Sequence, residues 1–168
     1  MRQSRGVLRI RSLIVAFLLL ALAASGARAQ EIELWGYGPV LEDERVQEAL
    51  MRAVDWPSST GSIFKDPYVP VVLYPQEGEP LDNRGLEFDP GRALELLKDA
   101  GVSELQFALL YVSDFNLALL ADAVADDLGQ LDIEVTPFEA SNEDELYEVE
   151  VYLANEGDLN ALVLELAQ

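Results

Sequence analysis

Four stretches of the chain have the pattern of β-strands. Residues 32–36 alternate apolar and acidic side chains and then meet Gly and Pro, which is typical of a strand end. Residues 105–112 and 160–166 are nearly continuous apolar runs, as strands buried on both faces are. Residues 133–138 form a shorter run of strand length. We therefore predict four strands.

Helical periodicity fills most of the space between these strands. In residues 44–54 and 117–131, apolar side chains recur every three or four positions, with charged side chains opposite. A third helix is marked by its end signals. Asp89 can cap its first turn, Pro90 fits the first helical position, and Gly101 can close it in the left-handed conformation. This helix is expected to bury one face, made of Ala93, Leu94, Leu97 and Ala100.

Two segments fit neither pattern cleanly. Residues 56–87 hold five of the eight prolines and are expected to be a long ordered loop. Apolar and aromatic residues that would pack it down are Phe64, Tyr68, Val71, Leu73 and Tyr74. In residues 141–158, Ser141 and Asp144 resemble a capping box, while residues 147–153 alternate like a strand that would form a hairpin with the last apolar run. Local propensity slightly favours the hairpin.

The order of these elements predicts an α/β fold. Strands alternate with helices along the chain, which is typical of a single layer of mainly parallel sheet with helices on both faces.

The first 29 residues differ from the rest. Four arginines precede the twelve-residue apolar run 13–24, and Ala27 and Ala29 have the small-x-small spacing of a signal peptidase site. A membrane anchor would need roughly 20 apolar residues. We therefore predict a secretory signal peptide over residues 1–29 and one domain over residues 30–168, which is periplasmic or secreted and not inserted in a membrane.

Composition then excludes several kinds of chemistry. Beyond the leader, six basic residues face 31 acids, a net charge of −25, which disfavours nucleic acid as a partner. Histidine and cysteine are absent, so Ser-His-Asp and Cys-His catalysis and the usual zinc and copper sites are excluded. No phosphate-binding glycine motif occurs. We predict no catalytic residue, no metal and no cofactor. Carboxylate pairs could hydrolyse sugars, but 31 acids form pairs by chance.

Six residues could contact a ligand. Ligands of open α/β sheets bind beyond the carboxyl ends of the parallel strands, and two predicted strands end in aromatic and polar residues. The candidates are Trp35, Tyr37, Tyr111, Ser113, Asp114 and Asn116. The alternative is that the aromatic residues belong to the core and the polar residues cap the next helix.

Five segments in order resemble a known family. They are "LEDERVQEALMRAVD", "FDPGRALELLKDAG", "LQFALLYV", "LADAVADDLGQLDIEV" and "EGDLNALVLEL". They are similar to consecutive segments of the second lobe of extracellular solute-binding proteins of family 5, which serve peptide-type ABC importers. The resemblance implies a lobe of a type II periplasmic binding protein, a helix at residues 142–155, a small solute or peptide as ligand, and an ABC permease as partner.

The resemblance covers one lobe, whereas members of the family close two lobes over the ligand. Glu165 and Leu166 stand where the family has Gly-Trp, and Trp56 stands where it has Arg. The leading hypothesis is a non-enzymatic binding module that is incomplete alone and is completed by a second lobe-like chain or by self-association. The alternative is a degenerate lobe that acts as a structural or protein-interaction domain without solute binding. An acid-pair hydrolase is a third hypothesis.

Overall fold

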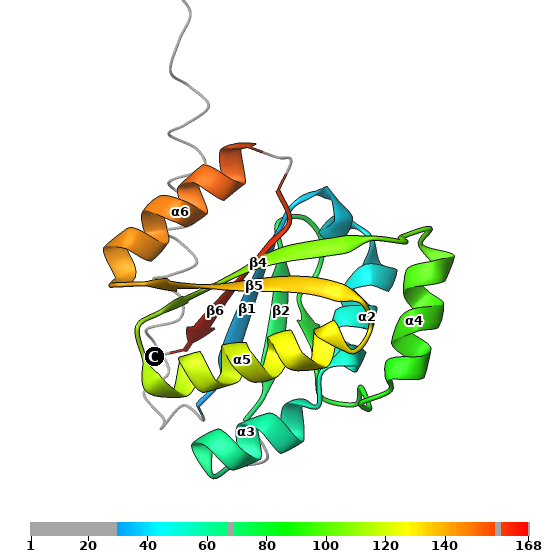
Figure 1. Cartoon of the computed structure of the whole chain (residues 1–168), viewed down its shortest axis with the longest axis horizontal. Helices are drawn as coiled ribbons and strands as arrows, with labels where there is room; N and C mark the ends of the chain where they lie inside the picture. Colours follow the sequence, from blue (N-terminus) through cyan, green and yellow to red (C-terminus); the bar gives the residue numbers. More distant parts are fainter. Residues whose placement is uncertain (1–29, 67–68, 157–158, 168) are drawn as a thin grey trace, which may run out of the picture.

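One six-stranded sheet organises the protein. The computed structural model describes residues 30–66, 69–156 and 159–167. The strands lie in the order β3-β2-β1-β6-β4-β5 (Figure 1). Their bounds are β1 Ile32–Tyr37, β2 Val71–Pro75, β3 Leu81–Asp82, β4 Leu105–Val112, β5 Ile133–Ala140 and β6 Ala161–Leu166.

The sheet is mixed and mostly parallel. β1 pairs with β2, β4 with β5, and β4 with β6 in parallel, whereas β1–β6 and β2–β3 are antiparallel pairs. The predicted α/β class is confirmed. The antiparallel β1–β6 pair has a consequence for the site, because β1 and β2 run opposite to β4, β5 and β6.

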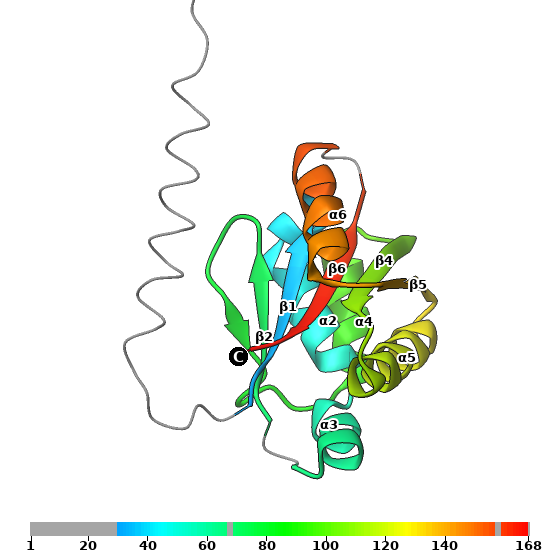
Figure 2. The ribbon, with the colours of Figure 1, turned by 90° about the vertical axis from the view of Figure 1, so that its left-hand side faces the viewer.

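In the part of the chain that the structure describes, five α-helices cover the two faces of the sheet unequally. They are α2 Glu44–Ala53, α3 Trp56–Phe64, α4 Pro90–Asp99, α5 Phe115–Gly129 and α6 Glu143–Glu156, and a 3₁₀ turn, η1, spans Pro39–Glu42. The four helices α2 to α5 bury the main core against one face, and α6 lies on the other face (Figure 2). The smaller cluster under α6 is made of Leu110, Ala140, Leu146, Ala161 and Val163. Helices therefore cover both faces, as predicted.

The end signals of α4 act as predicted. The Asp89 side chain accepts a hydrogen bond from the Arg92 amide at 2.9 Å, and Gly101 has a φ of 75°. The buried face differs by one position from the prediction, because Leu96 is buried while Leu94 is 48 % exposed. Ala93 and Leu97 are buried as expected.

Residues 56–82 are not the predicted loop. Asp55 caps α3 by accepting from the Ser58 amide at 3.2 Å, and Trp56 is 2 % exposed. Further on, the apolar stretch of β2 pairs in parallel with β1. Two of the prolines lie at the ends of these elements, Pro57 in the first turn of α3 and Pro75 at the end of β2, where they are tolerated. Tyr68 lies outside the described residues.

Residues 143–156 form the helix that the family resemblance implies. The hairpin favoured by local alternation does not form, since β6 pairs with β1 and β4. The cap lies one residue later than predicted. The Asn142 side chain accepts from the Glu145 amide at 3.0 Å, and the Glu145 carboxylate accepts from the Ser141 amide at 2.8 Å.

Candidate functional site

The six candidate ligand residues do not share one edge of the sheet. Tyr37 pairs with Ala161, and Ala161 pairs with Ala108 near the start of β4. Ser113 follows the far end of β4, about 16 Å away at the usual rise per strand residue. The expectation of a common edge was wrong, because it assumed that β1 and β4 run in the same direction.

Trp35 and Tyr37 lie on the face that carries α6. The Trp35 ring stacks on Tyr74, with the ring centroids 4.6 Å apart, and its Nε1–H donates to Glu33 at 3.2 Å. The Tyr37 hydroxyl donates to Glu150 of α6 at 3.1 Å. Tyr37 therefore ties α6 to the sheet, a structural task. Tyr74, Glu33 and Glu150 were missed because each comes from a separate segment.

Tyr111 is a core residue. Its side chain is 8 % exposed and belongs to the main core on the opposite face from Trp35. Burial, helped by the charges of Glu139 and Asp122, raises the pKa of its hydroxyl. The alternative interpretation of the sequence, that this aromatic residue packs in the core, agrees with its position.

The remaining three candidates do lie together. We use "strand-end edge" for the residues at or just beyond the carboxyl ends of β4 and β5, which are Ser113, Asp114, Asn116, Glu139 and Ser141. The Ser113 hydroxyl donates to the Glu139 carboxylate, and the Ser113 amide donates to the Ala140 carbonyl at 2.8 Å. These bonds fix the two strand ends side by side and leave Asn116 half-buried at the start of α5.

Two helices begin at this edge, and their first turns are already capped. Asp114 accepts from the amides of Asn116 and Leu117 at 2.9 and 3.0 Å. At α6, Asn142 and Glu145 fill the same role. Free amides at helix N-termini commonly bind phosphate or carboxylate groups. Here the chain's own oxygens take that place, so the edge is poorly suited to an anion.

Exposed apolar side chains lie beside the strand-end edge. Phe115 opens α5 and is 77 % exposed, and Leu119, one turn later, is 41 % exposed. The sequence analysis placed the buried stripe of this helix correctly but gave no role to Phe115. The signal that could have identified Phe115 as exposed is its position on the helix, away from the buried stripe.

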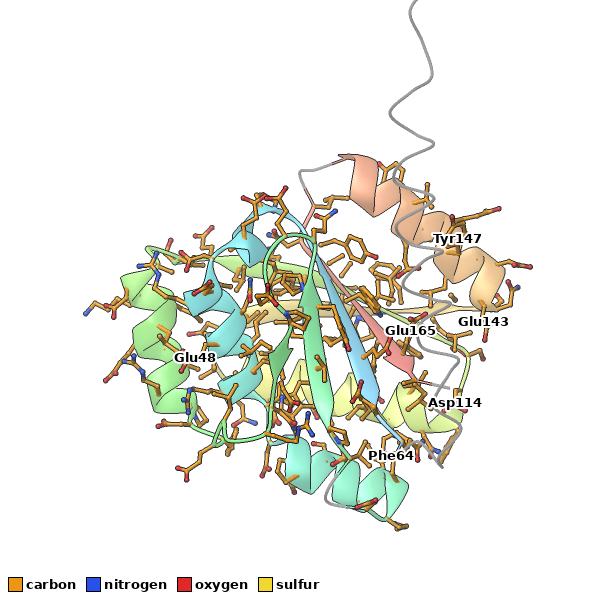
Figure 3. All side chains as sticks on the ribbon, turned by 180° about the vertical axis from the view of Figure 1, so that it is seen from behind. Glu48, Phe64, Asp114, Glu143, Tyr147 and Glu165 are labelled. Atoms are coloured by element: carbon orange, nitrogen blue, oxygen red, sulfur yellow. The ribbon has the colours of Figure 1, made fainter. Side chains whose placement is uncertain are left out.

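Glu165 lies where the strand-end edge meets the α6 face. It pairs in register with Glu33 of β1, and Glu150 of α6 is near. Glu143, at the start of α6, is also near (Figure 3). Burial and these three negative charges raise its pKa to about 7, with the nearby Trp35 indole offsetting part of the rise. Burial also raises the pKa of Glu150. Glu165 therefore titrates near neutral pH.

Basic side chains are far from this region in sequence. Residues 99–168 contain no Lys or Arg and 17 acids. Ion pairs join side chains within residues 43–95, namely Arg45–Asp43, Arg52–Glu48, Arg84–Asp82 and Arg92–Glu95. Among the described residues, no group of acids is arranged to hold a metal ion. The strand-end edge itself carries two carboxylates, those of Asp114 and Glu139.

The first and last strands meet at this same edge. The Ala167 amide donates to the Glu31 carbonyl at 2.9 Å, so β1 starts where β6 ends (Figure 2). Both strands thus reach the sheet beside Ser113 and Asp114.

Solved structures of solute-binding proteins share this fold. HbpA2 from Haemophilus parasuis superposes with a TM-score of 0.59 at 16% identity, over 83% of this chain and 29% of that one. The Escherichia coli murein tripeptide binding protein MppA gives 0.55 at 19% identity, over 92% and 33%. The oligopeptide-binding protein AppA from Bacillus subtilis, in complex with a nonapeptide, gives 0.56 at 16% identity, over 82% and 31%.

The chain has the fold of one lobe of a family 5 solute-binding protein. It spans about a third of the length of the proteins it superposes on. Neither the family models nor the curated proteins give a match to the sequence. Within the described residues, none of the helices is long and apolar enough to cross a membrane.

Proposed function

We propose that this protein is a periplasmic or secreted, non-enzymatic binding module that holds a small solute or peptide at the strand-end edge, as part of an ABC importer. The observation that carries the proposal is where the edge lies. The carboxyl ends of β4 and β5 meet the point where β1 starts and β6 ends. Ligands of open α/β sheets bind at such strand ends, and a second lobe joined there would close over them.

The residues that we propose to contact the solute are Ser113 and Asn116, with Phe115 beside them. Asp114 supports them by capping α5. Trp35 and Tyr37 are not part of this proposed site, because β1 runs away from the strand-end edge. Tyr111 packs in the core behind the edge. The proteins that share the fold include a murein tripeptide binding protein and an oligopeptide-binding protein, which supports a peptide-like ligand.

A single lobe is expected to bind weakly. An enclosed ligand buries most of its surface, whereas one edge contacts it from one side and the entropic cost of association remains. We expect a dissociation constant on the order of millimolar for the monomer. Tight binding then requires a second lobe-like chain or self-association.

Calorimetry and sedimentation of the exported protein test the proposal, with short peptides and sugars as probes. Asn116→Ala should weaken binding, while Gln130→Ala, which removes a matched amide at the other end of α5, should not. Micromolar binding by a monomer would refute the proposal that a single lobe is incomplete as a binding module. Mass spectrometry of the same sample should find Gln30 as the first residue, and an intact Met1 in the membrane fraction would contradict export with cleavage.

A second function is favoured by one observation. Phe115 and Leu119 leave apolar surface exposed beside the edge, and a structural or protein-interaction domain would cover such surface with a partner. Failure of every solute to bind, with a stable complex between this protein and a partner protein, would support it.

A further inference from the structure

We infer that α6 is a pH-sensitive element: it packs tightly on the sheet in mildly acidic solution and opens away from the sheet more often as the pH rises from 5 to 8. This behaviour belongs to the fold and does not depend on whether the strand-end edge binds a solute. Three features support it, which are the small apolar contact under α6, a hydrogen bond from β1, and an acid of β6 at the same contact.

The apolar contact between α6 and the sheet is small. Within residues 143–152 the buried side chain is Leu146, which is 1 % exposed, and Val149 packs half-buried against the same cluster. Tyr147 and Val151 of the same helix are exposed. The other four helices share the main core on the opposite face. An element with few buried apolar contacts can open locally at a lower free-energy cost than the core, so the packing of α6 is sensitive to changes at single groups.

A hydrogen bond ties α6 to the first strand. The Tyr37 hydroxyl of β1 donates to the Glu150 carboxylate at 3.1 Å, and both side chains are half-buried. Burial and the charge of Glu150 raise the pKa of this hydroxyl, so it keeps its proton from pH 5 to pH 8. Because the donor does not titrate in this range, a pH response of α6 has to come from another group.

Glu165 of β6 is the group that titrates at this contact. Val163, two residues earlier in the strand, is buried under α6, and side chains two residues apart in a strand point to the same face of a sheet. Glu165 is itself half-buried, and Glu143 in the first turn of α6 lies near it (Figure 3). The charge state of Glu165 therefore bears directly on the contact between α6 and the sheet.

The titratable groups that face Glu165 come from β1 and α6. They are Glu33 and Tyr37 of β1 and Glu143 and Glu150 of α6. On its other side, β4 presents the apolar side chains of Leu110 and Val112 to this face. Burial has the largest effect on Glu165 and the charge of Glu150 the next largest. With smaller effects of Glu33 and Glu143, and with the Trp35 indole offsetting part of the rise, they raise its pKa to about 7.

The sign of the pH dependence follows from proton binding. When α6 opens, water reaches Glu165 and Glu150 moves away, so the pKa of Glu165 falls toward its ordinary value of 4.5. The closed state therefore holds the proton more tightly than the open state. Its stabilisation is complete below pH 4.5 and is lost as the pH rises through about 7. We expect the equilibrium constant for opening α6 to rise about tenfold between pH 5 and pH 8, since water screens part of the effect.

Hydrogen exchange of the exported protein at pH 5, 6, 7 and 8 tests the inference. Each exchange rate is divided by the rate of an unstructured peptide at the same pH, so the protection factor reports opening alone. Protection of the α6 amides should fall about tenfold from pH 5 to pH 8. Low concentrations of urea should change their exchange little, because opening one helix exposes little surface, whereas the amides of β1 and β4 should respond to urea.

Three variants connect the effect to the named residues. Glu165→Gln cannot titrate, so protection of α6 should stay at its pH 5 level up to pH 8. Glu104→Gln, which removes an exposed carboxylate before the start of β4, should keep the pH dependence of the wild type. Tyr37→Phe removes the hydrogen bond to Glu150 and leaves Glu165 in place, so it should lower α6 protection at every pH and keep the pH dependence.

Each contrary outcome overturns a stated part of the inference. Protection of α6 that is the same at pH 5 and pH 8 would show that its packing does not respond to pH. A pH dependence that survives Glu165→Gln would remove Glu165 as its cause. Equal protection and equal urea dependence of α6 and β4 would show that α6 opens only when the whole domain unfolds. Unchanged protection in Tyr37→Phe would overturn the attachment of α6 through Glu150.

Discussion

Replacing Glu165 by Gln should make the protein more stable at pH 8 and leave its stability at low pH nearly unchanged. The substitution keeps the size of the side chain and its capacity for hydrogen bonds, and removes a negative charge that faces Glu33, Glu143 and Glu150. The free energy of unfolding is the measured quantity.

The magnitude follows from the pKa of Glu165. A rise in pKa from 4.5 in the unfolded chain to about 7 in the folded protein corresponds to at most ~3.4 kcal/mol. The side chain is only half-buried, so water screens the repulsion. We therefore expect an effect of about 1 to 2 kcal/mol.

The sign follows from proton binding. The folded protein holds the Glu165 proton more tightly than the unfolded chain does, so the stabilisation is complete below pH 4.5 and is lost as the pH rises through about 7. The wild type should lose this contribution between pH 5 and pH 8. The Gln variant cannot titrate at this position, so the difference between the two proteins should open over the same range.

Urea unfolding followed by circular dichroism at pH 5, 6, 7 and 8 measures the effect. Glu104→Gln is the control, because it removes one carboxylate from an exposed position before β4. Every acid contributes to the general repulsion of a highly charged chain, and the control subtracts that part. A difference between Glu165→Gln and wild type that is the same at pH 5 and pH 8 would refute the reasoning.

Two further substitutions test the packing. Leu146→Ala should lower the free energy of unfolding by about 3 kcal/mol and increase hydrogen exchange in α6, because Leu146 is 1 % exposed between α6 and the sheet. Tyr147→Ala is the control and should change little, because Tyr147 is 65 % exposed. Equal effects of the two substitutions would contradict the packing of α6 on the sheet. Gly38→Ala should lower the free energy of unfolding, measured in urea, by about 2 kcal/mol more than Gly78→Ala. The two glycines have φ values of +107° and +109°, but a Cβ at Gly38 would lie 2.5 Å from the Leu159 carbonyl oxygen. Equal costs would show that the backbone around Leu159 moves to make room for the Cβ.

The sequence predicted the buried strands and the capped helices because their signals are local. Asp89 and Gly101 fix the ends of α4 through bonds and dihedral angles within a few residues. The prediction failed in residues 56–82, where the prolines suggested a loop and α3 and β2 were missed. Helix α3 has few strong helix formers and depends on the burial of Trp56 and Thr60, which is a tertiary effect.

The candidate site was harder to predict because strand direction is absent from the hydrophobic pattern. Residues 32–36 would alternate in the same way in either direction, and only the pairing of β1 with β6 separates Tyr37 from Ser113. The helix at residues 143–156 was predicted through the family resemblance, against a local pattern that favoured a strand. The sequence could not single out Glu165, because its acidic neighbours Glu33, Glu143 and Glu150 come from other segments and meet it only in the fold.

The hydrogen bond between Ala167 and Glu31 has a consequence for protein engineering. A domain that the chain enters and leaves at neighbouring positions can be inserted into a surface turn of a host protein without distorting the host backbone. The same property permits circular permutation, because a short linker would bridge the two positions and new termini could be opened in an exposed turn such as the one around Gly78. The domain could therefore be inserted into another protein, and the two connecting peptides at Glu31 and Ala167 would set its orientation on the host.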